Sequence, residues 1–150
     1  MDSYLDCPYL SLILYDKKER GMNMQTENKL MEALGMEFRE TEKNKVVMTM
    51  PVDERTHQPA GYLHGGASVL LAETAASIGG FLNIDSSTQA VFGLEINANH
   101  LRSKKSGMVT ATATPYHIGR TTMVWDIKIT DEDDRLICIS RCTLGVVNQK

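Results

Sequence analysis

Residues 61–80 read Gly-Tyr-Leu-His-Gly-Gly-Ala-Ser-Val-Leu-Leu-Ala-Glu-Thr-Ala-Ala-Ser-Ile-Gly-Gly, an apolar segment that holds one carboxylate, Glu73. From Thr56 to Ile84 no other residue carries a formal charge when histidine is neutral. Burying a carboxylate among aliphatic side chains costs several kcal/mol, on the order of the whole stability margin of a domain. The pattern marks Glu73 as a candidate functional acid, and leaves open a structural acid that pairs with an arginine or caps a neighbouring element.

Glycine pairs flank the periodic part of this segment. One pair stands at 65–66 and the other at 79–80, so we expect a helix from Ala67 to Ile78 that is opened and ended by glycines. Its first free N–H groups would lie at residues 64–66. Such groups form a site for an anion or a polarised carbonyl oxygen, and glycine there permits close approach by a ligand.

The acid and the glycine end of this helix are far apart. Glu73 lies about two turns beyond Gly65, roughly 12 Å at 1.5 Å rise per residue. Ser77 shares the face of Glu73, four residues on, while Leu71 and Ile78 occupy another face. One small substrate does not comfortably reach both ends. A symmetry-related copy would bring its Glu73 to the first copy's glycine end.

Length and composition set broad limits. With 150 residues and 42% hydrophobic content, the chain predicts one compact domain. The formal net charge of -3 argues against a nucleic-acid partner. The 61–80 segment is broken by glycines, a histidine and a glutamate, and the apolar run 10–15 is short, so we expect no membrane span.

The cysteines favour a reducing, cytoplasmic location. There are three, Cys7, Cys138 and Cys142, with no Cys-x-x-Cys spacing. On one strand the last two would be about 13 Å apart, too far for a disulfide. The four histidines are scattered, so the sequence predicts no metal site. It also lacks a phosphate-binding Gly-rich loop and a Gly-x-Ser-x-Gly motif.

The rest of the chain predicts an α+β domain at residues 25–150, behind an N-terminal extension at 1–24. A short helix capped by Thr26 should end at Gly35, and a hairpin should turn at 42–45. Four further strands are expected, at 90–97 (continuing toward 102), 108–117, 121–130 and 135–147. The acidic turn 131–134 should be solvated. Short connections imply an antiparallel sheet with the long helix on its apolar face.

The segment Gln58-Pro-Ala-Gly-Tyr-Leu-His-Gly-Gly-Ala-Ser-Val-Leu-Leu-Ala-Glu73 resembles the hot-dog-fold acyl-CoA thioesterases, in particular the branch that includes hydroxybenzoyl-CoA and dihydroxynaphthoyl-CoA thioesterases. The likeness continues through residues 93–103, 117–119 and Trp125, and spans about 36–147. The resemblance implies a long central helix wrapped by a curved antiparallel sheet. It also implies sheets paired in a homodimer or homotetramer, with active sites at the dimer interface.

The resemblance assigns catalytic roles to five residues. Glu73 would attack the thioester carbonyl or activate the water that does. The Gly65 N–H would polarise the carbonyl oxygen and hold the oxyanion. His64 and Gln58 would orient the substrate and their own loop. Ser77 would position the water or the acid.

Coenzyme A would enter as part of the substrate, so no separate cofactor is expected. Its phosphates require a basic rim, for which Arg102 is the best candidate. His100, in the same family-like stretch, is a further candidate for contact with coenzyme A. The remaining candidates for coenzyme A contact are Arg120, Lys104 and Lys105 at the rim, and the backbone of Phe92 and Gly93 along the pantetheine arm.

The leading interpretation is thus an acyl-CoA thioesterase that acts on an aryl or medium-chain acyl group. A hot-dog dehydratase is a second interpretation, although the usual Asp/His pairing of that class is not what this stretch contains. A non-catalytic acyl-CoA-binding protein is the third. Steady release of thiol from several acyl-CoAs would separate the enzyme from the binder.

Overall fold

The computed structural model describes residues 28–149, so the expected extension at 1–24 and the expected cap Thr26 lie outside the described residues. Two helices and six strands follow one another along this part of the chain. In order they are α2 (Lys29–Leu34), β1 (Glu37–Glu42), β2 (Lys45–Val52), α3 (Gly65–Phe81), β3 (Gln89–His100), β4 (Gly107–Ile118), β5 (Thr122–Thr130) and β6 (Leu136–Asn148).

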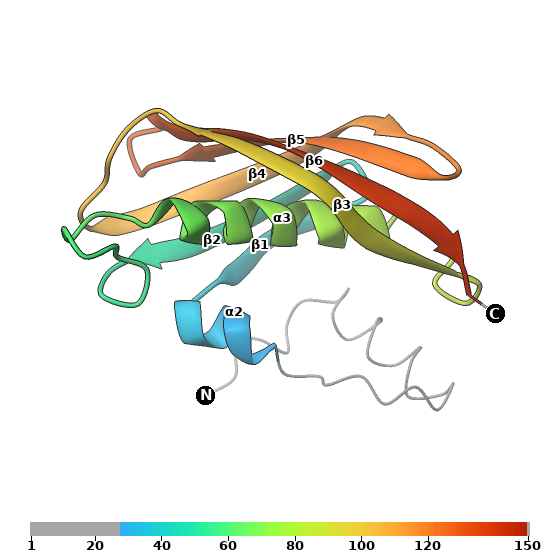
Figure 1. Ribbon diagram of the computed structural model, residues 1–150, viewed down its shortest axis with the longest axis horizontal. Coiled ribbons are helices and arrows are strands. Elements are labelled where there is room, and N and C mark those ends of the chain that lie inside the picture. The colour runs from blue at the N-terminus through green and yellow to red at the C-terminus, as the bar shows by residue number, and fades with distance from the viewer. Residues whose placement is uncertain (1–27, 150) are drawn as a thin grey trace.

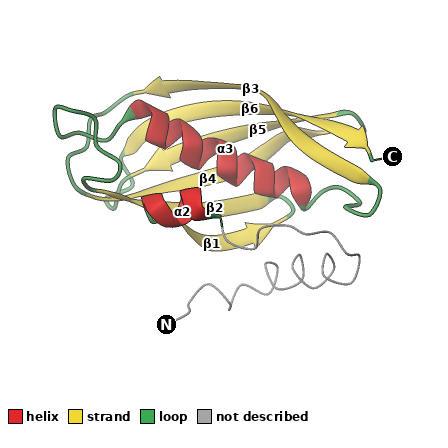
Figure 2. Cartoon of the chain, turned by 60° about the horizontal axis from the view of Figure 1, so that its bottom comes forward, coloured by secondary structure: helices red, strands yellow, loops and turns green. Residues whose placement is uncertain are grey.

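The strands form one curved antiparallel sheet in the order β1-β2-β4-β5-β6-β3. Helix α3 lies along one face of this sheet, and α2 lies beyond the β1–β2 end (Figures 1 and 2). The expected hot-dog arrangement of one long helix wrapped by a curved antiparallel sheet is therefore confirmed. Strands β1 and β3 are its edges, and an edge strand offers unpaired backbone groups to another chain.

Helix α3 is longer at both ends than the sequence predicted. Its buried side carries mostly small residues, with one leucine, at helical spacing: Ser68, Leu71, Ala72, Ala75, Ala76, Gly79 and Gly80. The expectation that glycines 79–80 end the helix is wrong, because the helix continues to Phe81. A Cβ on Gly79 would collide with the Trp125 ring, and one on Gly80 with Leu144. These two glycines allow close contact between helix and sheet.

Helix α2 begins at a different cap from the one expected. The Asn28 side chain accepts the Met31 N–H at 3.2 Å, which makes Asn28 the N-cap. The helix ends, as predicted, at Gly35, whose φ of 66° is the left-handed conformation that glycine adopts readily. Of the helices in residues 28–149, none is long and apolar enough to cross a membrane.

The inner face of β6 follows the predicted alternation. Cys138, Ser140, Cys142 and Leu144 are buried toward the helix. The two cysteines are free, as the strand geometry required. Strand β3 pairs with β6 so that Gly93 stands opposite Leu144. This register brings the middle of the edge strand β3 beneath helix α3.

Candidate active site

The start of helix α3 keeps one backbone donor free. His64 is the N-cap, and its Nδ1 accepts the Gly66 N–H at 2.8 Å, so the other ring nitrogen carries the proton. The Ala67 N–H donates to the His64 carbonyl at 3.0 Å. Within the described residues the Gly65 N–H has no hydrogen-bond partner. A helix N-terminus with a free N–H can bind a developing oxyanion.

An open pocket of about 420 Å³ faces this helix start. Its lining brings together four of the predicted site residues, Gln58, Gly65, His100 and Arg102. A Cβ on Gly65 would lie 2.8 Å from His100 Nε2, so the histidine ring packs where only glycine leaves room. The buried Ser68 also lines the pocket. In the sequence Ser68 looks like an ordinary helix position, so no local pattern marks it as a pocket residue.

Glu73 does not line this pocket, although it belongs to the same helix as Gly65. Its side chain is half-buried, and a Cβ on Gly93 would lie 2.6 Å from Glu73 Oε1. Across residues 28–149 the carboxylate makes neither a hydrogen bond nor an ion pair. The alternative of a structural acid held by an arginine therefore finds no such partner there. Ser77, one turn further on, is also half-buried.

The surroundings of Glu73 are apolar on the sheet side. Burial raises the pKa of the Cys142 thiol to about 12, and the nearby carboxylates of Glu73 and Glu95 add to that increase. This thiol stays protonated at neutral pH. Burial likewise raises the pKa of Cys138. Neither cysteine is an accessible nucleophile.

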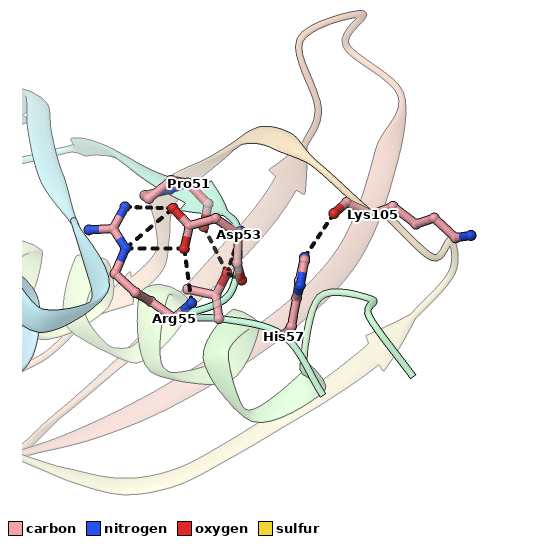
Figure 3. A network of polar contacts seen from close by, with 6 residues as sticks. Pro51, Asp53, Arg55, His57 and Lys105 are labelled. Carbon is pink, nitrogen blue, oxygen red and sulfur yellow. Dashed lines mark hydrogen bonds and ion pairs between the residues drawn. The ribbon is translucent and has the colours of Figure 1, made fainter. Parts of the chain in front are cut away.

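The loop before α3 is tied down by a buried threonine. Thr56 Oγ1 donates to the Pro51 carbonyl at 2.9 Å, and the Thr56 carbonyl accepts the His64 N–H at 2.8 Å. Beside it, Arg55 and Asp53 form an ion pair at 2.6 Å, and the Arg55 side-chain hydrogen bond lowers the pKa of Asp53 (Figure 3). Thr56 thus fixes the N-cap from one side. Its role depends on backbone bonds that a residue pattern does not show.

Residues 101–106 lie at the rim of the pocket and carry three basic side chains, of which one is neutralised by an ion pair. Arg102 makes no ion pair with any described residue, and Lys105 lies 4.9 Å from the centre of the Tyr62 ring. Lys104 instead pairs with Glu132 at 2.6 Å, which removes it from the rim candidates. The adjoining depression of about 550 Å³ shares Arg102 with the pocket and is also lined by Lys105.

The acidic turn 131–134 is only partly solvated, contrary to the prediction. Asp131 is buried. Its carboxylate is stabilised there because it accepts the backbone N–H groups of Asp133 and Arg135 and pairs with the Arg135 side chain. The Arg135 hydrogen bond lowers the pKa of Asp131 to about 2. Glu132 reaches across to Lys104 and Met108. This turn is therefore part of the framework next to the pocket.

Two of the predicted coenzyme A contacts lie elsewhere in the chain. Arg120 is in the β4–β5 turn, at the other end of β4 from the 101–106 rim (Figure 1). Phe92 is 58% exposed on the edge strand β3, away from the pocket. Within one copy of the chain, neither Arg120 nor Phe92 lies at the pocket that Arg102 lines.

The histidines do not gather into a metal site. His57 Nε2 lies 2.8 Å from the Lys105 carbonyl oxygen. Because a carbonyl oxygen can only accept, Nε2 carries the proton and donates it. His117 packs on Gly119 in the β4–β5 turn. In the part of the chain that the structure describes, no three His, Cys, Asp or Glu side chains could hold one metal ion.

Comparisons with known proteins agree with this geometry. The family model described as the thioesterase superfamily matches residues 60–138. The chain is 57% identical over 121 residues to the 1,4-dihydroxy-2-naphthoyl-CoA hydrolase of Listeria monocytogenes, which covers 81% of this chain and 98% of that protein. A mutant thioesterase from Pseudomonas aeruginosa superposes with a TM-score of 0.81 and 42% identity, covering 97% of this chain and 98% of the other. A thioesterase from Haemophilus influenzae gives a TM-score of 0.77 and 49% identity over 81% and 85% of the two chains.

Proposed function

Because the chain belongs to the thioesterase superfamily, we propose that it hydrolyses an aryl- or medium-chain acyl-CoA to the free acid and coenzyme A, at sites completed by a second copy of the chain. One observation carries the proposal. A half-buried carboxylate, Glu73, and a free backbone donor, the Gly65 N–H, have no partner among the described residues although both belong to helix α3. They are roughly 12 Å apart along the helix, so one thioester needs each from a different copy.

The free edge of β3 offers the surface for that second copy. Glu73 lies over Gly93, and Gly65 lies beside His100, so both halves of the site stand on this one strand. Two antiparallel β3 strands related by an axis near residues 96–97 would place each Gly93 opposite the His100 of the second copy. Pairing there would also cover Leu94, which is 62% exposed.

The chemistry divides between the two copies. Glu73 attacks the thioester carbonyl carbon, or removes a proton from the water that attacks it, and the Gly65 N–H of the other copy stabilises the oxyanion. Collapse of the tetrahedral species breaks the C–S bond, and coenzyme A leaves as a thiolate that takes a proton from water or, in the general-base route, from the Glu73 carboxyl. In the nucleophilic route the acyl group remains on Glu73 as a mixed anhydride, which a water molecule then hydrolyses to the free acid and the Glu73 carboxylate. One oxyanion donor is typically worth about 10²–10³-fold in rate.

The pocket beside Gly65 supplies orientation. Gln58 Oε1 accepts the Ala60 N–H at 2.6 Å, which leaves the amide NH₂ of Gln58 to donate toward a substrate oxygen. Leu63 and Leu101 give the pocket an apolar wall suited to an acyl group. Arg102 and Lys105 at the rim meet the coenzyme A phosphates. His64 holds the helix start, and Ser77 positions the acid or the water.

The decisive test replaces Glu73 by Gln and measures thiol release across aromatic, short and long acyl-CoAs. The change keeps volume but removes the carboxylate, so kcat should fall by roughly 10²–10⁴-fold, while acyl-CoA binding stays largely intact. The described cysteines are buried and should add little background in a thiol assay.

Glu42→Gln is the matched control. Glu42 is an exposed carboxylate at the end of β1, at the opposite edge of the sheet from β3, so its loss leaves the proposed interface and site untouched. Its kcat should stay within a few-fold of the parent. A Glu73→Gln protein as active as this control would refute the catalytic role of Glu73. A parent that binds acyl-CoA but releases no thiol would favour the non-catalytic binding protein.

A further inference from the structure

Lys104 connects the acidic β5–β6 turn to the loop that carries the helix start. Its side chain is only 11% exposed, and its Nζ lies 2.6 Å from Glu132 Oε2. Its own carbonyl accepts the Leu63 N–H at 2.8 Å. The next carbonyl, that of Lys105, is bound by His57 at 2.8 Å (Figure 3). A single residue thus joins the turn on one side and the residue before the His64 N-cap on the other.

Glu132 is itself fixed in this position. Its Oε1 accepts the Met108 N–H at 2.5 Å while Oε2 faces Lys104. Gly107 has a φ of 94°, and a Cβ there would collide with the Glu132 carboxylate. The buried Asp131 holds the turn by hydrogen bonds within it. The carboxylate therefore has little freedom to follow Lys104 if that segment moves.

The segment that Glu132 restrains has few other restraints. Residues 101–106 belong to no helix or strand. The N–H groups of Leu101 and Arg102 donate to the Ile137 carbonyl at 2.8 and 3.3 Å, which fixes the beginning of the segment. Its far end is held by the Lys104–Glu132 pair and by the hydrogen bond from His57 to the Lys105 carbonyl. A charge-assisted hydrogen bond with a mostly buried partner is stronger than an exposed ion pair.

We propose that Glu132 is a positioning residue for thioester hydrolysis, which acts through Lys104 to hold Leu63 and therefore the orientation of the Gly65 N–H. The inference rests on the proposed function for its kinetic consequence, but the backbone restraint is independent of it. Thr56 restrains the same loop through the His64 N–H. The two anchors bind adjacent backbone N–H groups, those of Leu63 and His64, and loss of either would let the free Gly65 N–H turn.

A positioning role predicts a particular kinetic pattern. The Gly65 N–H acts mainly when charge develops on the carbonyl oxygen, so its misorientation lowers kcat and leaves KM nearly unchanged. The loss should be equal with acyl-CoA and with a short acyl-pantetheine, because the Gly65 N–H would act on the thioester carbonyl oxygen, which both substrates share. A residue that only contributed charge to the coenzyme A rim would instead raise KM for acyl-CoA alone.

The test compares Glu132→Gln and Lys104→Met with two controls. Asp134→Asn removes one charge from the same turn, at a residue with φ of 58° that asparagine tolerates, and Lys104→Arg keeps the positive charge and reach. We expect both test variants to lower kcat about tenfold, below the roughly hundredfold that a full ångström of misplacement can cost. Exchange of the Leu63 amide hydrogen should become faster in both. The two controls should match the parent.

Several results would overturn the proposal. They are unchanged exchange at Leu63 in both test variants, an equal loss in Asp134→Asn, or a loss confined to KM for acyl-CoA. If Glu132→Gln does not fold, Lys104→Met gives the answer, because it leaves the Glu132–Met108 bond in place. If the parent releases no thiol from any acyl-CoA, the proposed function fails, while the exchange measurement still decides whether Glu132 restrains the loop.

Discussion

The two glycine pairs of helix α3 look alike in the sequence, but they lie at opposite ends of the helix in different surroundings. At residues 65–66 an added Cβ would meet the imidazoles of His100, which lines the pocket, and of His64, and both side chains are exposed. At residues 79–80 it would meet Trp125 and Leu144, which are fully buried. One end of the helix is kept open for a ligand and the other is closed for packing. The environment of a glycine, more than its presence, thus decides what it does.

Among changes at the two glycine pairs, the largest effect should come from Gly79→Ala. The Trp125 ring is rigid and 0% exposed, so the new methyl group forces either the helix or the ring to move. Overpacking of this kind costs up to about 3 kcal/mol, more than the gain of up to about 1 kcal/mol in helix propensity. Urea unfolding should show the loss. The kcat per folded molecule should change little, and a variant as stable as the parent would contradict the packing role.

Gly65→Ala should show the reverse pattern, with a smaller effect. The new methyl group meets the ring of His100, an exposed side chain that can swing away, so the free energy of unfolding should stay near that of the parent. The displaced ring and the methyl group intrude on the pocket, and kcat/KM should fall about tenfold, equivalent to about 1.4 kcal/mol. Steady-state kinetics and urea unfolding on the same sample separate the two effects. Loss of stability without loss of activity would mean that both pairs are packing glycines.

The contrast also explains which parts of the fold the sequence could predict. Strand alternation and turn residues predict the antiparallel sheet, because the polarity of each side chain indicates which face of the sheet it occupies. Glycine has no side chain that indicates which face it occupies, so the sequence alone predicts a helix end at the 79–80 pair. Only the position of Trp125, 46 residues later in the chain, reveals the close contact.

The candidate site was predictable to a similar degree. The segment from Gln58 to Glu73 carries enough chemistry to be recognised as a unit, and the structure brings Gln58, Gly65 and His100 to one pocket. The anchors Thr56 and Glu132 were missed. Thr56 acts through backbone groups, and Glu132 acts across 28 residues of sequence on Lys104, so neither forms a local pattern.

The smallest predicted effect is a difference in how acid loosens the two ends of α3. The hydrogen bond from Lys104 lowers the pKa of Glu132 from 4.5 to about 2. A carboxylate with a depressed folded-state pKa stabilises the fold fully above its unfolded value and loses that contribution as pH falls toward the folded value. Between pH 4.5 and about 2, the anchor at the open end therefore weakens.

At the closed end the packing of Gly79 on Trp125 involves no titrating group, so acid should not loosen it over the same range. We expect amide protection, corrected for intrinsic exchange, to fall at Leu63 and Met108 as the pH is lowered, while the Leu82 amide, which bonds to the Ile78 carbonyl, stays protected. Glu132→Gln should remove most of the acid dependence at Leu63, because its anchor is already lost at neutral pH. If all three amides lose protection at the same pH in the parent, the chain unfolds as one unit, and the two ends of the helix do not differ in their response to acid.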